Sequence, residues 1–200
     1  MTLRYNKPTP DETAEWWKWL LEIPKPNNPL ITGNIAQKQD RHFLCMACTG
    51  PFNSVEDHGR YHKMSAEDAK KPIMIPVFVA ERSEAEFNAN SAQLLNGARQ
   101  DVADTTELEL TVDKDLSLTT QDLREFYVES SDFQVDLPDN NVLGVPKTKQ
   151  SNTASAGIWV RLEPLASGKH AVRFGGTGGS NAAGGTGKFH TKVTYSIEVP

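Results

Sequence analysis

The second half of this chain is a succession of short strand-like segments, and this succession most restricts the fold. In residues 107–112, leucine and valine alternate with glutamate and threonine, which is typical of a strand with one buried and one exposed face. Turn residues separate five further candidate strands, at residues 124–129, 133–137, 158–162, 170–174 and 192–199. Many short strands in succession favour an antiparallel β-sandwich, and we expect the last three to form its edge.

The best-marked single element is a helix near the N-terminus. Thr9-Pro10-Asp11-Glu12 has the pattern of a capping box with proline at the first helical position. Pro24 cannot continue a helix, so the pattern predicts a helix over residues 10–23.

Apolar residues cover more than one side of this helix. Helical spacing places Trp16 and Trp19 on one stripe, which we expect to be buried. Trp17 and Leu21 are neighbours on another side, so we expect Trp17 to be exposed and to contact a second copy of the chain. The helix therefore predicts a homo-oligomer. Aromatic faces also suit sugar rings, which makes Trp17 and Tyr61 candidates for binding a glycan.

The middle of the chain is predicted to contribute one buried strand and one inserted helix. Residues 72–80 form an apolar run of strand length, and a shorter strand is expected at residues 42–47. Between them, residues 52–71 are polar and aperiodic, which predicts a long surface loop. A second capping box at residues 83–86 predicts a helix that continues to about residue 103.

These elements favour a single α+β domain over residues 1–200. An N-terminal arm, residues 1–8, precedes the first helix, and residues 106–200 form most of a mainly antiparallel β-sandwich. Residues 175–187 are rich in Gly, Ser, Thr and Ala, which predicts a loop between two strands. This loop does not have the Walker spacing of a phosphate-binding loop, because Phe189 rather than Ser or Thr follows Lys188.

Charge and hydropathy argue against two classes of partner. The net charge is −5 and the 21 Lys and Arg residues are scattered, so we expect no nucleic-acid partner. No apolar run approaches the roughly 18 to 20 residues of a membrane helix, so we expect an acidic, soluble protein. The first residues also lack the apolar segment of a signal peptide. This fits a cytoplasmic protein, or a secreted one whose leader has been removed.

Several motifs follow one another along most of the chain: Trp16-Trp17-Lys18-Trp19, Lys71-Pro72-Ile73, Leu137-Pro138-Asp139-Asn140-Asn141, Gly168-Lys169-His170 and Phe174-Gly175-Gly176. In this order they resemble a family of uncharacterised bacterial proteins with a Trp-Trp-x-Trp helix and a C-terminal Gly-Lys-His…Phe-Gly-Gly β module. The resemblance implies a secreted or periplasmic protein and implies no particular activity. The family tends to carry separated cysteines, in a disulfide, whereas here Cys45 and Cys48 lie close together.

The clearest candidate site combines two cysteines with two histidines. Cys45 and Cys48 are followed by His58 and His62, and paired thiolates and imidazoles are the ligands of a tetrahedral zinc site. The nine residues between Cys48 and His58 are fewer than in the usual zinc finger. The alternative is that Cys45 packs in the core while His58 and His62 lie on a solvated loop. No other cofactor is expected.

The remaining titratable residues form no recognisable catalytic set. Four carboxylates within residues 107–115 could be paired acids or calcium ligands, but alternating charges on a strand usually form its solvated face. His170 and His190 could meet across neighbouring strands. No nucleophile elbow, zinc-protease helix or dinucleotide fingerprint occurs. We therefore expect a non-catalytic binding or self-assembly module, with a zinc protein or metal-dependent enzyme, and a carbohydrate-binding module, as the alternatives.

Overall fold

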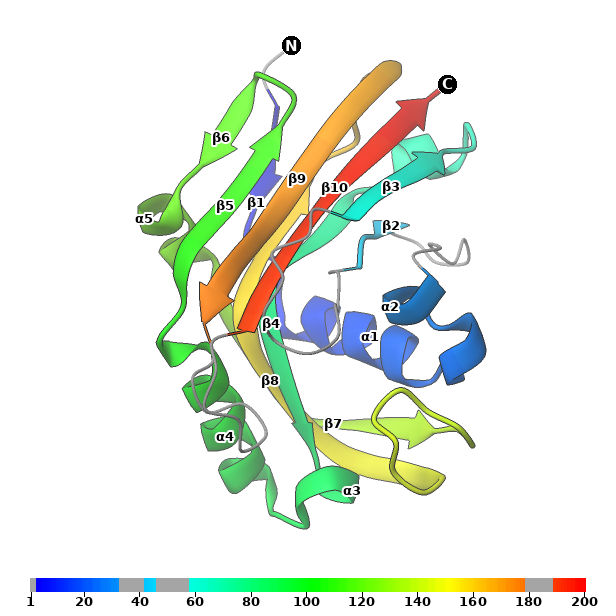
Figure 1. Ribbon diagram of the computed structural model, residues 1–200, viewed down its shortest axis with the longest axis vertical. Helices are drawn as coiled ribbons and strands as arrows, with labels where there is room; N and C mark the ends of the chain where they lie inside the picture. The colour runs from blue at the N-terminus through cyan, green and yellow to red at the C-terminus, as the bar shows by residue number, and fades with distance from the viewer. Residues whose placement is uncertain (1–2, 33–41, 46–57, 179–188) are drawn as a thin grey trace.

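The computed structural model describes residues 3–32, 42–45, 58–178 and 189–200, which form two packed β-sheets flanked by helices (Figure 1). One sheet has the strand order β1-β8-β4-β2, with β7 also paired to β8, and the other has the order β3-β10-β9-β5-β6. Most neighbouring strands are antiparallel. The predicted fold class, an α+β mainly antiparallel β-sandwich with an N-terminal helix and an inserted helix, is confirmed.

The first sheet is organised around its longest strand, β8 (Thr148–Leu162). It pairs antiparallel with β1 (Tyr5–Asn6), with β4 (Ile73–Ser83) and with β7 (Tyr127–Leu137). The short strand β2 (His42–Phe43) pairs parallel with β4. Residues 153–160 of β8 are all buried, which is expected for a strand that is covered on both faces.

The second sheet contains, in spatial order, β3 (His58–Lys63), β10 (Phe189–Val199), β9 (Gly168–Gly178), β5 (Thr106–Val112) and β6 (Leu116–Leu118). The alternation predicted in β5 is confirmed, because its two leucines and its last valine are buried while the residues between them are more exposed. Strand β3 runs parallel to β10, and the other pairs in this sheet are antiparallel.

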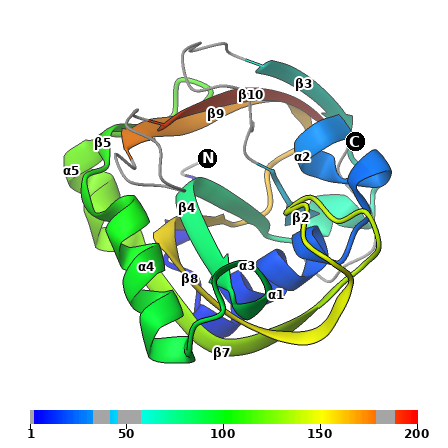
Figure 2. The ribbon, with the colours of Figure 1, turned by 60° about the horizontal axis from the view of Figure 1, so that its bottom comes forward.

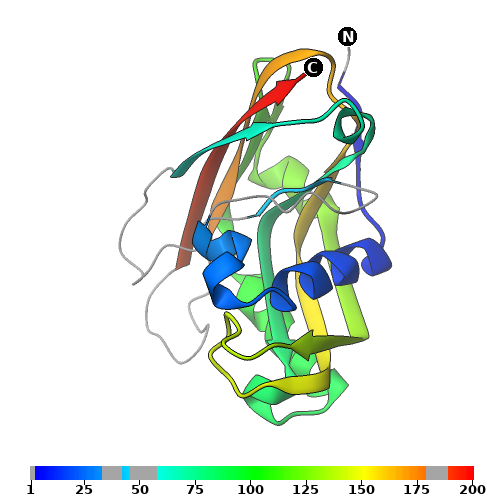
Figure 3. The same ribbon diagram turned by 90° about the vertical axis from the view of Figure 1, so that its right-hand side faces the viewer.

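Helix α1 (Pro10–Leu21) begins where the capping box predicts. The Thr9 amide donates to a Glu12 carboxylate oxygen at 2.8 Å, and the Glu12 amide donates to the Thr9 hydroxyl oxygen at 3.3 Å. These two bonds satisfy amides that a helix end otherwise leaves free. The helix then lies across the strands of the first sheet (Figure 3).

Two helices cover β8 on opposite faces. The Trp159 ring lies 5.2 Å from the ring of Trp16 on α1, whereas the preceding residue, Ile158, lines a hollow with Val102 of α4 (Ser91–Ala103). Successive residues of a strand point to opposite faces, so the first sheet separates α1 from α4. Figure 2 shows β8 between these two helices.

The inserted helix is broken in two, so the prediction of one continuous helix is wrong in its first part. Helix α3 (Glu84–Phe87) ends at Asn88, whose φ of 47° and ψ of 49° are left-handed. Asn90 and Gln93 then form the capping box of α4, with the Gln93 amide donating to the Asn90 side-chain oxygen at 3.0 Å. Asparagine favours both roles, because it tolerates the left-handed region and caps helices well.

Several predictions about strands are also wrong. The surface loop predicted at residues 52–71 contains β3, which pairs with a strand distant in the sequence. Residues 124–126 form a 3-10 turn rather than the start of a strand. The last three strands do not form an edge, since β8, β9 and β10 each lie between two neighbours. Of the strand predicted at residues 42–47, only His42–Phe43 is found, and residues 46–47 lie outside the described part of the chain.

Short helical turns complete the described elements: η1 (Lys25–Asn27), α2 (Pro29–Thr32), η2 (Asp68–Lys70), α5 (Thr120–Leu123) and η3 (Arg124–Phe126). In the part of the chain that the structure describes, no helix is long and apolar enough to cross a membrane. The predicted glycine-rich loop is described only as far as Gly178, at the end of β9, and the rest of it lies outside the described residues.

Candidate functional site

The predicted Cys/His site is only partly covered by the described residues. Cys45 is fully buried after β2, where its amide donates to the Tyr195 hydroxyl oxygen at 3.1 Å. Cys48 lies outside the described residues, and of His58 only the backbone is described. His62 is buried on β3, and this burial lowers its pKa below the ordinary value.

The two histidines lie on a strand rather than on a loop. Four residues of extended chain place the Cα atoms of His58 and His62 roughly 13 Å apart. This spacing does not favour both imidazoles as ligands of one ion. Among the described side chains, no group of three or more His, Cys, Asp or Glu could hold a metal ion. The zinc hypothesis, which also involves Cys48, stays a prediction.

The exposed surface predicted on α1 is wrong. Trp17 is only 4% exposed and Leu21 only 1%. The Trp17 ring lies 4.8 Å from the Trp16 ring and 6.4 Å from the Trp159 ring. Trp159 belongs to β8, so this side of the helix is covered by a strand that the helical pattern could not reveal. Tyr61, in contrast, is 67% exposed on β3 and is the one residue of the predicted partner surface that is accessible.

The two C-terminal histidines do not meet, so that prediction is also wrong. His170 lies near the start of β9, whereas His190 lies on β10 opposite Thr177, near the end of β9. Residues 170 and 177 are seven apart on an extended strand, a separation of roughly 23 Å.

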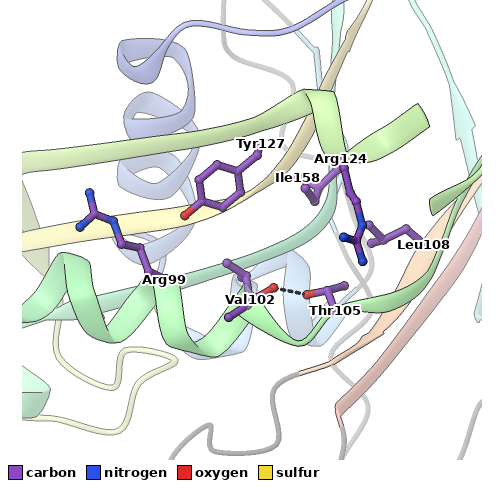
Figure 4. A pocket seen from close by; sticks show the side chains of 8 residues that line it. Arg99, Val102, Thr105, Leu108, Arg124, Tyr127 and Ile158 are labelled. Carbon is purple, nitrogen blue, oxygen red and sulfur yellow. Dashed lines mark hydrogen bonds between the residues drawn. The ribbon is translucent and has the colours of Figure 1, made fainter. Parts of the chain in front are cut away.

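A pocket of about 380 Å³ lies between α4, the start of β5, η3 and the paired strands β7 and β8 (Figure 4). Val102, Leu108 and Ile158 give it an apolar wall. Its polar side chains are few: Arg99, Thr105, Arg124 and Tyr127. An apolar hollow of this size with a small number of polar groups has the character of a small-molecule site.

One of the two arginines in this pocket is already neutralised. The Arg99 guanidinium donates to both carboxylate oxygens of Glu129, at 2.8 and 2.7 Å. The Tyr127 hydroxyl donates to the same carboxylate at 2.8 Å. The hydrogen bond from Arg99 holds the pKa of Glu129 below its ordinary value, and burial together with the bond to Glu129 raises the pKa of Tyr127. At neutral pH, Glu129 is therefore ionised and Tyr127 keeps its proton.

The second arginine of the pocket, Arg124, has no charged partner among the described residues. It is exposed on η3, and its side chain makes no hydrogen bond or ion pair with any described residue. Figure 4 shows its guanidinium over the pocket, near Leu108 and on the side away from Arg99. The Thr105 hydroxyl donates within its own turn, to the Val102 carbonyl oxygen at 2.6 Å. A positive charge that no described residue neutralises thus lies above an apolar wall.

One local pattern in the sequence indicates the turn that carries Arg124. Thr119 and Asp122 have capping-box spacing, and the structure forms the box, with the Thr119 amide donating to the Asp122 carboxylate at 2.9 Å. This box starts the turn of α5 and η3 that carries Arg124. The pocket itself could not be predicted, because its lining comes from elements far apart in the sequence.

Comparison with known proteins gives no match: no family model, no curated protein and no solved structure matches this chain. The function of the pocket is therefore inferred from its own geometry and chemistry.

Proposed function

We propose that this pocket is a non-catalytic binding site and that it takes a small amphipathic anion, such as a medium-chain carboxylate. The proposal depends on one observation, the guanidinium of Arg124 above an apolar wall with no partner in the described part of the chain. Burial of an alkyl chain against Val102, Leu108 and Ile158 supplies affinity, because apolar surface leaves water. Arg124 supplies the preference for a negative head group.

The charges around the pocket support an anionic rather than a cationic ligand. The carboxylate of Glu129 contacts the pocket residues Arg99 and Tyr127, and its two oxygens already accept hydrogen bonds from them. Tyr127 keeps its proton, so it offers no base at neutral pH. These features favour binding over catalysis at this site.

The other hypotheses have less support. Self-assembly through α1 loses its basis, since Trp17 and Leu21 are buried within one chain. A glycan site would have to use Tyr61, whose exposed ring packs against no other aromatic ring among the described residues. Zinc binding by the Cys/His cluster remains an alternative that metal analysis can test directly.

Calorimetric titration with octanoate and with 1-octanol at low ionic strength tests the proposal. We expect octanoate to bind with a 1:1 stoichiometry and about tenfold more tightly than octanol, a difference of about 1.4 kcal/mol. Arg124→Gln should abolish that difference and leave octanol binding unchanged. Lys149→Gln is the matched control, because it removes an exposed positive charge that lies outside the pocket.

Two results would contradict the proposal. One is the absence of binding for octanoate and for a bulkier apolar anion, anilinonaphthalene sulfonate. The other is equal weakening of octanoate binding by Arg124→Gln and by Lys149→Gln, which would indicate a general effect of net charge rather than a contact in the pocket.

A further inference from the structure

A second hollow, of about 200 Å³, lies on the outer side of the second sheet, at one end of β5, β9 and β10. It uses none of the residues that line the pocket, and most of its own lining residues have polar side chains. The side chains that matter here are Glu107 and Glu109 of β5, Thr177 of β9, and His190 and Lys192 of β10.

Three of these side chains form a hydrogen-bonded chain. The Thr177 hydroxyl donates to a Glu107 carboxylate oxygen at 2.8 Å, and the same hydroxyl oxygen lies 2.8 Å from Nδ1 of His190. Glu107 reaches Thr177 from a β-bulge and has a φ of 54°, a left-handed conformation that a residue with a side chain rarely adopts. Such strained backbone often occurs at functional sites.

The direction of these bonds fixes where the His190 proton lies. An ionised carboxylate can only accept, so the single proton of the Thr177 hydroxyl is directed at Glu107. The Thr177 oxygen must then accept from His190, which requires the proton of the neutral imidazole to be on Nδ1. Nε2 consequently carries a lone pair, and among the described residues no partner of this nitrogen is found.

This arrangement differs from that of His170. Nδ1 of His170 lies 2.7 Å from a carboxylate oxygen of Asp113, and Nε2 lies 2.8 Å from the Ala166 carbonyl oxygen. Both ring nitrogens of His170 are thus engaged by oxygen acceptors, which leaves neither available to a ligand. His190 has one ring nitrogen oriented by a hydrogen-bonded pair and the other uncommitted, as a general base requires.

A positive group lies beside this base. Lys192 is two residues from His190 on β10, and both line the hollow. Its ammonium lies 3.3 Å from a Glu109 oxygen that Arg173 also contacts at 3.2 Å. An ammonium has three protons, so Lys192 can hold Glu109 and still donate to a second oxygen. The register places Gly175 opposite both Glu109 and Lys192, so no side chain stands between them.

We propose that this hollow is a hydrolytic site for small esters, with His190 as the catalytic base and Lys192 as the donor to the carbonyl oxygen. A water oxygen forms a bond to the carbonyl carbon while one of its protons passes to Nε2 of His190. The intermediate then expels the alcohol oxygen, which takes that proton, so that ester and water become carboxylic acid and alcohol. Glu107, acting through Thr177, offsets the positive charge that the ring holds between the two steps.

Hydrolysis of p-nitrophenyl acetate by the purified full chain tests this activity, after subtraction of the rate given by free imidazole at the same concentration. We expect His190→Gln to lower the rate on the order of 100-fold. Thr177→Val should also lower the rate of hydrolysis. Thr177→Ser keeps the hydroxyl, so it should retain most of the rate that Thr177→Val loses. His170→Gln is the matched control and should hydrolyse as the unaltered protein does.

A measurement without substrate tests whether Thr177 orients the His190 ring or only supports the fold. Nitrogen-15 NMR of the unaltered protein should show the His190 proton on Nδ1, and Thr177→Val should lose that preference while Thr177→Ser keeps it. The proposal is overturned if the proton resides on Nε2, or if His190→Gln hydrolyses the ester at the original rate. Because these results do not involve Arg124, they leave the proposed anion pocket unaffected.

Discussion

Gly97 lies inside helix α4, and we expect its replacement by alanine to destabilise the protein although alanine is the better helix former. A Cβ atom at this position would lie 2.5 Å from Cδ and 2.7 Å from Nε of Arg82. That side chain cannot move aside freely, because its guanidinium donates to both carboxylate oxygens of Asp101, each at 2.8 Å. It also lies 4.5 Å from the centre of the Phe87 ring.

Gly97→Ala destabilises the protein if breaking the Arg82–Asp101 ion pair costs more free energy than alanine gains as a helix former. Alanine in place of glycine stabilises a helix interior by about 1 kcal/mol. Displacing Arg82 would break a pair whose side chains are only 20% and 9% exposed, and would leave the Asp101 carboxylate without its partner. Breaking such a partly buried pair costs about 2 to 4 kcal/mol. We therefore expect Gly97→Ala to lower the free energy of unfolding by about 1 to 3 kcal/mol.

Urea unfolding followed by tryptophan fluorescence measures this change, provided that the slope with denaturant stays constant. The decisive control is the same substitution in an Arg82→Ala background, where the clash and the ion pair are both absent. There, Gly97→Ala should stabilise the protein by about 1 kcal/mol. Stabilisation of the same size in both backgrounds would refute the reasoning, because it would show that Arg82 does not occupy the space beside Gly97.

Two further predictions concern buried groups. Burial, and then the charge of Glu86, raises the pKa of Glu81 well above 4.5, so the folded protein loses stability as pH rises through that raised value. Urea unfolding should find Glu81→Gln more stable than the unaltered protein at about pH 8 and little different below about pH 4, and an unchanged pH dependence would contradict this. Trp17→Glu should prevent folding or cost several kcal/mol, because it places a carboxylate beside Trp159. Thermal unfolding by circular dichroism checks this against Trp17→Phe, and a fully stable Trp17→Glu protein would show that the ring is not buried.

Elements whose signals are local were predicted correctly from the sequence. The capping box at Thr9 and Glu12 specifies the start of α1, because both of its bonds are made within one turn. The alternation in β5 specifies which residues are buried, because a strand with one covered face has a period of two.

Elements that depend on distant partners were missed. Strand β3 has no apolar alternation, and two polar residues, Arg60 and His62, occupy its alternate positions. Arg60 becomes acceptable there because it donates to the Tyr195 hydroxyl oxygen at 2.8 Å, and Tyr195 comes from β10, far along the chain. The burial of Trp17 depends in the same way on Trp159. Sequence periodicity describes one element at a time, so it contains no information about either partner.

The bulge in β5 contributes one residue to each of the two proposed sites. The register of β5 against β9 shifts between Thr106 and Glu109, and the extra residue increases the local twist. At this point Glu107 turns outward to accept from Thr177, while the next residue, Leu108, stays buried and lines the anion pocket. The left-handed φ of Glu107 costs about 1 to 2 kcal/mol for any residue with a Cβ atom. The hydrogen bond between Thr177 and Glu107 is one of the contacts that offset this cost. A regular strand would keep the alternation of β5 but would lack the bend that aims Glu107 at Thr177.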